Sequence, residues 1–321
     1  MDKEKFVINC IEGDTPGDVE KMDTEAREVM DKAVAAYKKG EVVEFSEFIH
    51  TNQWHYFNEQ TKGIPGQVEL YGPLPNEWQV DSTKEIKVFN KLSYDASQMA
   101  LENNRKFPFQ GYKRDTQYLD KHFLLTYGIN SEFERECVMQ VLERLRLLEQ
   151  SVYSRPGLSA KSQKHISTDY IFPITNDNVQ YRNIEGTDKE HKRDYFYDLG
   201  PLPALYQAAK RVHCWVVLDV FPFNDNLLGV PTEKWVWPVF LGIPFIYIGS
   251  QRQMDVLSSW GIEPNDAYRN DTRGVAEQMM WLKSLFSDAD LAKKWQGKQG
   301  PLVVKNRETL DRVPKLINPS K

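Results

Sequence analysis

An acidic and a basic residue, Glu233 and Lys234, stand side by side at the start of the most apolar stretch of the chain, TEKWVWPVFLGIPFIYIGS (232–250). Thr232 is a favoured helix N-cap residue, so the sequence predicts that Glu233, Lys234 and Trp235 form a first helical turn. The helix dipole favours the glutamate there and disfavours the lysine. A lysine kept at this end indicates a bound anion, because exposed N–H groups, dipole and ammonium would act together. The alternative is a surface ion pair on an ordinary capped helix.

Pro238 follows inside the same predicted helix. There it would remove a hydrogen bond and clash with the preceding turn, at a cost of roughly 3 kcal/mol. Departures from local rules concentrate at functional sites, although a kinked core helix is the other explanation.

The elements that must position these residues alternate between strand and helix. Strands are predicted at 122–128, 151–155, 214–221 and 244–249, and helices at 131–150, 202–212, 251–261 and 275–286. Such alternation is typical of a parallel, doubly wound sheet, in which ligands bind outside the carboxyl ends of the strands. We therefore expect the four strands to share one sheet.

Two of these helices have apolar faces. The first face consists of Cys137, Val141, Leu145 and Leu148, and the second of Val275, Met279, Leu282 and Phe286. Further upstream, a strand is predicted at 5–11 and a helix at 24–40, capped by Thr24 and ended by Gly40. The stretch 41–120 suggests only short strands and loops.

The segment from the strand at 214–221 through Thr232, Glu233 and Lys234 to a Pro-Phe strand ending in Gly249 and Ser250 resembles a known family. It is similar to the nucleotide-sugar-binding half of fucosyltransferase-like glycosyltransferases with the GT-B fold, most of all to compact bacteriophage versions. Residues 122–155 resemble the strand, arginine-containing helix and short strand of the same proteins.

The resemblance implies an α/β protein with two Rossmann-like halves and a parallel, doubly wound sheet in the C-terminal half. An N-terminal acceptor-side domain is expected at 1–120, a nucleotide-sugar-binding domain at 121–305 and a C-terminal tail at 306–321.

The resemblance also implies roles for individual residues. Glu233 would accept hydrogen bonds from ribose hydroxyls, and Lys234 would neutralise a diphosphate leaving group as charge builds on it. Arg135 would face the phosphates; its alternative is a solvated arginine among glutamates. The implied donor site consists of Thr232, Glu233, Lys234, Arg135, Asp219, Gly249 and Ser250.

Inverting glycosyl transfer needs a base that takes the proton of the acceptor hydroxyl, and the N-terminal half should supply it. The stretch FSEFIHTNQWHYFNE holds four candidates by residue type, namely Glu47, His50, His55 and Glu59. Packed surface histidines are one alternative. A metal site from His50, His55 and a carboxylate is another, but it has no recognised ligand spacing. The resemblance implies a nucleotide sugar as the donor substrate, and it also implies that no bound metal is needed.

The sequence hypothesis is thus a nucleotide-sugar-dependent, inverting glycosyltransferase with a hydroxyl acceptor. The bacteriophage resemblance makes a hydroxymethylated base in phage DNA one candidate acceptor, and a glycan or protein another. Tyr127 and Gly128 stand where the family often has Asn-Arg, which favours a rival: a binding or structural protein that kept the fold and lost catalysis. A different nucleotide-sugar enzyme on the same fold is the third hypothesis.

Charge, cysteine count and the length of apolar runs indicate which partners and which compartment to expect. The net charge of −5 argues against a protein that coats polyanions, but not against a local basic groove. The mixed basic and aromatic stretch at 111–123 could line a groove for a nucleic acid strand or form a solvated linker. Three scattered cysteines favour a reducing compartment, and no apolar run is long enough to span a bilayer. We expect a cytoplasmic protein, in the host cytoplasm if phage-encoded, without a membrane partner.

Overall fold

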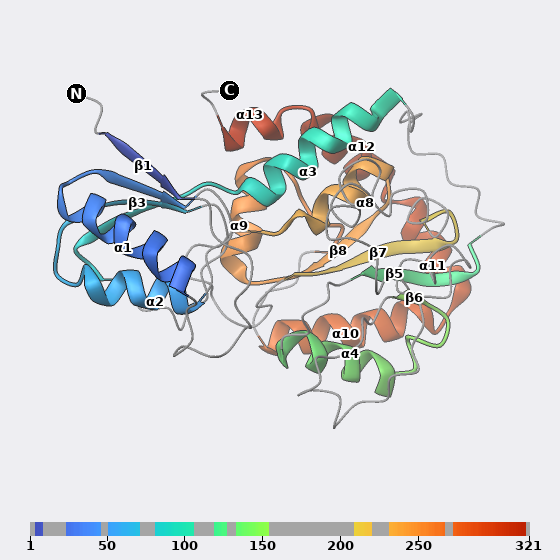
Figure 1. The fold of residues 1–321 in the computed structure, drawn as a ribbon. Coiled ribbons are helices and arrows are strands. Elements are labelled where there is room, and N and C mark those ends of the chain that lie inside the picture. Colours follow the sequence, from blue (N-terminus) through green and yellow to red (C-terminus); the bar gives the residue numbers. More distant parts are fainter. Residues whose placement is uncertain are drawn as a thin grey trace, which may run out of the picture.

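The computed structural model describes residues 4–8, 24–45, 51–70, 81–105, 119–126, 133–153, 209–219, 231–266 and 272–318. These residues form a mixed α/β arrangement with two four-stranded sheets, and both sheets are parallel throughout (Figure 1). Sheet A contains β1 (Lys5–Ile8), β2 (Val42–Phe45), β3 (Gly66–Leu70) and β4 (Lys84–Val88). Sheet B contains β5 (Lys121–Thr126), β6 (Val152–Tyr153), β7 (Val212–Leu218) and β8 (Phe245–Ile248).

Ten α-helices and two 3-10 helices are described with them. The α-helices are α1 (Thr24–Lys38), α2 (Thr51–Gln60), α3 (Lys91–Glu102), α4 (Phe133–Arg144), α8 (Val236–Leu241), α9 (Gln251–Ser259), α10 (Thr272–Phe286), α11 (Ala289–Gly297), α12 (Gly300–Leu310) and α13 (Val313–Ile317). The 3-10 helices are η1 (Asn103–Arg105) and η3 (Glu233–Trp235). No helix in the described ranges is long and apolar enough to cross a membrane.

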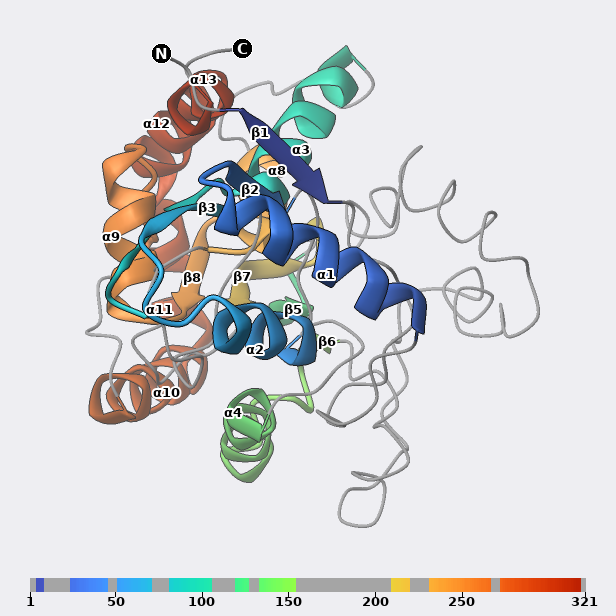
Figure 2. The same cartoon turned by 60° about the vertical axis from the view of Figure 1, so that its left-hand side comes forward.

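In sheet A the strands follow one another in chain order, β1-β2-β3-β4. Consecutive crossovers of one hand place their helices on the same face, and α1 and α2 lie together on one side of the sheet (Figure 2). Phe45, Val68, Trp54, Phe57 and Tyr37 form the centre of the core between them. The strands alternate apolar and polar residues, as in KEIKV of β4, because only one face is packed in this way.

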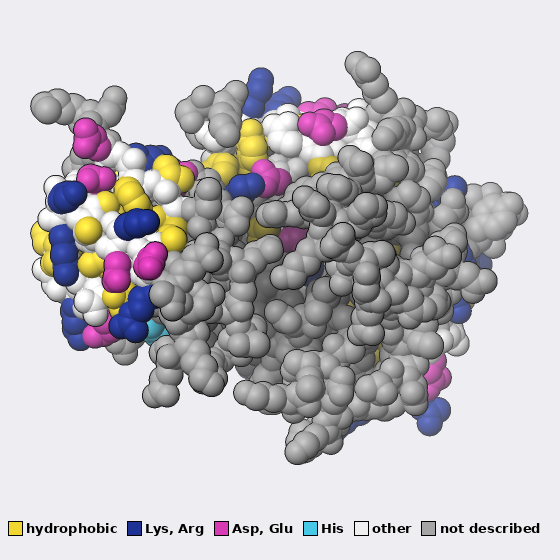
Figure 3. Space-filling view, in the orientation of Figure 1, with side chains coloured by type: hydrophobic (Ala, Val, Ile, Leu, Met, Phe, Trp, Pro, Cys, Tyr) yellow, Lys and Arg dark blue, Asp and Glu magenta, His cyan; other side chains and the backbone are white. Residues whose placement is uncertain are grey.

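The opposite face of sheet A is polar. Lys5 of β1 reaches across to Glu44 of β2 and Glu69 of β3. Val7, on the same face of β1, is 51% exposed. At the left of Figure 3, basic, acidic and apolar side chains are interspersed on the surface of the described residues around sheet A, α1 and α2.

Sheet B has the order β6-β5-β7-β8, which confirms that the four strands predicted in the second half share one sheet. The central strand β7 is buried along its whole length, so it reads as a continuous apolar run. It begins at Val212, two residues before the predicted start.

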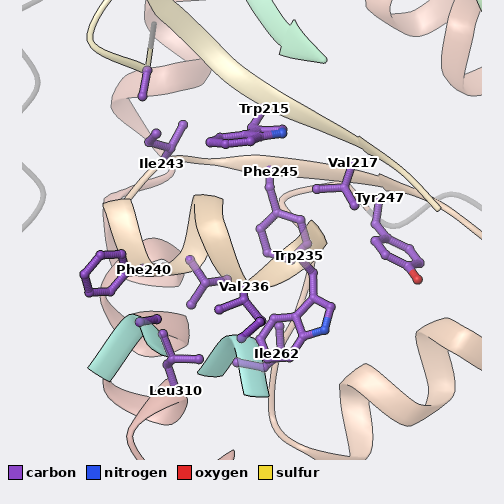
Figure 4. Packing of buried hydrophobic residues seen from close by; sticks show 14 of the residues in the cluster. Trp215, Val217, Trp235, Val236, Phe240, Ile243, Phe245, Tyr247, Ile262 and Leu310 are labelled. Atoms are coloured by element: carbon purple, nitrogen blue, oxygen red, sulfur yellow. The ribbon is translucent and has the colours of Figure 1, made fainter. Parts of the chain in front are cut away.

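Helices cover both faces of sheet B. On one face Trp215, Val217 and Phe245 pack against α3, α8, α9, α12 and α13 (Figure 4). On the other face Val216 and Ile246 pack against α4, α10 and α11. Figure 1 shows α3 and α8 on one side of the strands and α4 and α10 on the other.

The predicted apolar face of α10 is confirmed, because all four of its residues are buried. The face predicted for α4 is wrong. Val138, Met139 and Leu142 are buried, whereas Val141 is exposed. The error has a physical reason: the helix ends at Arg144, and a turn then carries Leu147 and Leu148 into the core, so the helical period cannot be extended to them.

The domain boundaries stay a prediction, but two features bear on them. Helix α3 belongs to the predicted N-terminal domain, yet its Ala96 and Ala100 are part of the core of sheet B. Leu310 and Val313, in the predicted C-terminal tail, are fully buried in the same core. The packed unit around sheet B therefore includes chain from both sides of the 121–305 segment.

Candidate functional site

The strand order of sheet B marks the carboxyl ends of its two inner strands, β5 and β7, as a candidate binding site. The chain passes from β5 to β6 on one side and returns to β7 on the other side of β5. Connections at the carboxyl ends of β5 and β7 therefore diverge, and in open parallel sheets such a switch point is where ligands bind. Asp219, directly after β7, stands at this point.

Asp219 is completely buried and organises the segment that follows. Its Oδ2 accepts a hydrogen bond from the backbone N–H of Thr232 at 2.9 Å, and its Oδ1 accepts one from the Thr232 hydroxyl at 2.6 Å. The hydroxyl of Tyr247, on β8, donates to Oδ2 as well. A buried carboxylate is stable only with such donors, so Asp219 holds the start of η3 against the carboxyl edge of the sheet.

Thr232 occupies the predicted N-cap position, but its side chain does not cap the helix. The hydroxyl donates to Asp219 and accepts a hydrogen bond from Lys234 Nζ at 3.1 Å. The prediction of a side-chain cap is therefore wrong, because a buried acceptor thirteen residues away in sequence competes for the hydroxyl.

Glu233 and Lys234 form the first turn, as predicted, although the turn is 3-10 rather than α-helical. The Lys234 ammonium lies 3.7 Å from Glu233 Oε1. The Lys234 side chain is 14% exposed and that of Glu233 is 35% exposed. The pair is thus partly sheltered, and among the described residues the ammonium makes one hydrogen bond, to Thr232. An ammonium has three donors, so an anionic ligand could use the remainder.

The expected kink at Pro238 is not required. The α-helical segment α8 begins at Val236, so Pro238 lies in its first turn. An N–H in the first turn has no partner within an α-helix, and its absence therefore costs no hydrogen bond. The inferred strain of about 3 kcal/mol is wrong, because it assumed one α-helix starting at Glu233.

Gly249 and Ser250 follow β8 at the same edge. Ser250 caps α9 in a capping box with Gln253: each side chain bonds the backbone N–H of the other residue. A Cβ on Gly249 would lie 2.4 Å from a ring carbon of Tyr247. Both residues therefore have structural tasks beside the Tyr247–Asp219 contact, and the motif S-x-x-Q at 250–253 is a sequence signal for the cap.

Sequence reasoning missed the residues of α3 that touch this segment. Asn90 Nδ2 donates to the carbonyl of Pro231 at 2.8 Å. The Ser93 hydroxyl donates to the same carbonyl at 3.1 Å and accepts from Trp235 Nε1 at 3.0 Å. The available signal was local: an Asn before KLSYDASQMALE is typical of a helix start, but nothing in it names a partner.

These contacts bring the carboxyl ends of the two sheets together. Asn90 follows β4 by two residues, and Pro231 is one residue from Thr232, which Asp219 binds at the end of β7. The carboxyl ends of β4 and β7 therefore lie on either side of the segment that carries Glu233 and Lys234.

The predicted base candidates are placed in part. His55 lies on α2 and is partly buried. Glu59 lies in the last turn of α2, where it is exposed and 4.0 Å from Lys62. Because α2 starts after the carboxyl end of β2 and runs back, Glu59 is about 12 Å along the helix from Thr51, toward the other edge. Glu47 and His50 lie outside the described residues.

Arg135 lies in the first turn of α4, which begins at Phe133. Its side chain lies outside the described part of the structure, as do Tyr127 and Gly128. Within the described ranges, no group of three or more His, Cys, Asp or Glu residues is placed to hold a metal ion.

A scan against protein-family models, a search of curated proteins and a search of solved structures each found no match for this chain.

Proposed function

We propose that this protein is a GT-B-like glycosyltransferase that moves a sugar from a nucleotide donor to a hydroxyl acceptor. One observation carries the proposal: a Glu-Lys pair lies at the switch point of a parallel sheet whose carboxyl edge meets that of a second parallel sheet. Two such sheets facing each other through their carboxyl ends would form the walls of a donor–acceptor cleft.

In this proposal Glu233 reads the nucleotide. A carboxylate can accept hydrogen bonds from both hydroxyls of a ribose, and Glu233 is the more accessible member of the pair. It gives the site a preference for a ribonucleotide over free pyrophosphate.

Lys234 stabilises the leaving group. Negative charge develops on a nucleoside diphosphate as its bond to the sugar breaks, and a fixed ammonium lowers the energy of that state. The hydrogen bond to Thr232, itself held by Asp219, keeps the ammonium in one place before the reaction starts.

The base would come from the N-terminal half. His55 and Glu59 on α2 are the described candidates, and Glu47 and His50, which follow β2 in the sequence, remain candidates as well. The acceptor would be the hydroxyl of a hydroxymethylated nucleobase in DNA or of a glycan. This hydroxyl would lose its proton to the catalytic residue as it attacks the sugar.

Titration calorimetry with uridine, guanosine, cytidine and adenosine diphosphates tests the donor site. Lys234→Ala should weaken binding by roughly 1.5 to 3 kcal/mol, the range for a hydrogen bond to a charged group. Glu233→Gln should weaken nucleotide binding and spare free pyrophosphate. Lys305→Ala is the matched control, because it removes an exposed lysine of α12 that is paired with Glu263. It should change the binding of neither nucleotides nor pyrophosphate. A wild-type protein that binds none of these compounds at millimolar concentration contradicts the proposal.

A second candidate is a binding or structural protein that kept this fold without catalysis. It is favoured by the Lys234 ammonium, which already bonds Thr232 and lies near Glu233. Nucleotide binding without hydrolysis of any nucleotide sugar, and without transfer to any acceptor offered, would support this candidate over the enzyme.

A further inference from the structure

The amino end of α3 makes two kinds of contact with different targets. Asn90 Oδ1 accepts from the backbone N–H of Ser93 and thereby caps the helix. Its Nδ2 points the other way and donates to the carbonyl of Pro231. One buried side chain therefore joins the start of α3 to the start of η3.

Ser93 strengthens the same junction. Its hydroxyl is fully buried, donates to the Pro231 carbonyl and accepts from the indole N–H of Trp235. A buried serine on a helix can satisfy itself on its own backbone, as Ser97 does one turn later by donating to the Ser93 carbonyl at 2.6 Å. Ser93 instead bonds residues about 140 positions away, on both sides of the Glu233–Lys234 pair.

The pair is consequently held from two directions. From the side of sheet B, Asp219 accepts both hydrogen bonds of Thr232, and Tyr247 donates a further one to Asp219. Asn90 and Ser93 hold Pro231 and Trp235 from the side of α3, which continues from β4 of sheet A. The Pro231 carbonyl before the pair and the Trp235 indole after it are both held, so the Glu233 and Lys234 side chains start from a defined position.

We propose that Asn90 and Ser93 are positioning residues for the Glu233–Lys234 pair, and that the affinity for a nucleoside diphosphate depends on them although neither touches it. The inference rests on the proposed function, because it assigns a ligand to that pair. It adds that the donor site is completed by a helix that leaves sheet A, so the two halves are not independent in binding.

Three variants separate positioning from general helix stability. Asn90→Ser keeps a good N-cap residue and loses the amide that reaches Pro231. Ser93→Ala removes the acceptor for Trp235 and the donor to Pro231. Ser97→Ala is the matched control, since it removes an equally buried hydroxyl from the same helix without touching the 231–235 segment.

The first measurement is calorimetry with uridine and guanosine diphosphates. Asn90→Ser and Ser93→Ala should each weaken binding about tenfold, whereas Ser97→Ala should leave the affinity within about twofold of wild type. Equal losses in Ser93→Ala and Ser97→Ala would overturn the proposal, because the effect would then follow from a weakened helix.

The second measurement needs no ligand. Hydrogen exchange of peptides covering 231–241 should be faster in Asn90→Ser and Ser93→Ala than in wild type and Ser97→Ala. Unchanged exchange in this segment overturns the positioning role. If wild type binds no diphosphate, the proposed function fails, and faster exchange confined to 231–241 still supports a role of Asn90 and Ser93 in holding the pair. Because Asn90→Ser is conservative, the test survives a Ser93→Ala protein that does not fold.

Discussion

Sheets A and B are both parallel and four-stranded, but they differ in strand order and in the covering of their faces. Sheet A adds each strand beside the previous one, and the helices that connect its strands lie on one face. In sheet B, β6 is added on one side of β5 and β7 and β8 on the other, so the order of strand addition reverses at β5, and helices cover both faces of the sheet. The reversal brings a switch point, and Asp219 and the Glu233–Lys234 pair lie there.

The difference teaches which sheet can be changed without loss of the fold. A face that carries Lys5, Glu44 and Glu69 tolerates water and charge. A face that packs on a helix layer does not, because a charge there loses its hydration and gains no partner. Sheet B should therefore determine stability and the position of the site, and sheet A should be more permissive on its polar face.

The largest expected contrast is between two valines. Val216→Lys places an ammonium in the fully buried core between β7 and α10, and we expect a loss of several kcal/mol and an unfolded protein. Val7→Lys changes a residue that is 51% exposed and opposite Glu44, and should alter the unfolding free energy by less than about 0.5 kcal/mol. Urea denaturation followed by circular dichroism measures both. A large loss in Val7→Lys would show that the polar face of sheet A is covered.

Two carboxylates give the next contrast. Asp219→Ala leaves Thr232 and Tyr247 with buried donors that have lost their acceptor, and should cost about 3 to 5 kcal/mol. Glu69→Ala removes a surface partner of Lys5 and should cost less than about 1 kcal/mol. Chemical denaturation measures the unfolding free energy of both variants. Similar losses would mean that the hydrogen bonds to Asp219 stabilise the protein no more than a surface ion pair does.

Two glycines refine the comparison further. An added Cβ would lie 2.4 Å from Tyr247 at Gly249 and 2.6 Å from Tyr37 at Gly66, so each Gly→Ala change should cost about 1 to 3 kcal/mol. Only Gly249→Ala disturbs the tyrosine that holds Asp219, so only this variant should also weaken diphosphate binding. Gly297→Ala, with no atom within 4 Å of the added Cβ, is the control for both measurements. Weaker binding in Gly66→Ala would contradict the division of roles.

The smallest effect concerns pH. Burial, together with nearby Lys283 and Lys121, lowers the pKa of His122 on β5 below its usual 6.5. The unfolded chain therefore binds a proton more readily, and stability should fall as the pH drops below about 6.5. Urea titrations between pH 5 and 8 should show a smaller slope in His122→Gln than in wild type. An identical slope would contradict the assignment.

The stability that Lys5 contributes to sheet A should not change between pH 5 and 8. Hydrogen bonds to Glu44 and Glu69 raise the pKa of Lys5 above its usual 10.5, so its contribution is fully present below that pH and is lost only as the pH rises through the folded-state pKa. Lys5→Ala should thus shift the stability curve between pH 5 and 8 without changing its slope.

Local sequence patterns predicted much of sheet B. The long apolar run of β7 and the period of Val275, Met279 and Leu282 were readable because strand and helix have fixed spacings. Gly40 was readable as a helix end, and it adopts a positive φ; Gly261, the last residue of the helix predicted at 251–261, does so too. In sheet A the strand at 5–11 was predicted and matches β1, but the later strands were predicted only as unplaced short strands, because they are four or five residues long and include charged residues. The helices α2 and α3 were missed.

The sequence by itself determined the strand succession of sheet B, the place of Glu233 and Lys234 in a first turn, and the residue types available there. Only the tertiary structure decided that Thr232 bonds Asp219, that Tyr247 joins them, and that Asn90 and Ser93 close the segment from the other side. The physical reason is range. Helix and strand periods are set by neighbours a few residues apart, whereas a buried hydrogen-bond donor takes whichever acceptor the packing brings to it, and the partners of Ser93 lie about 140 residues away.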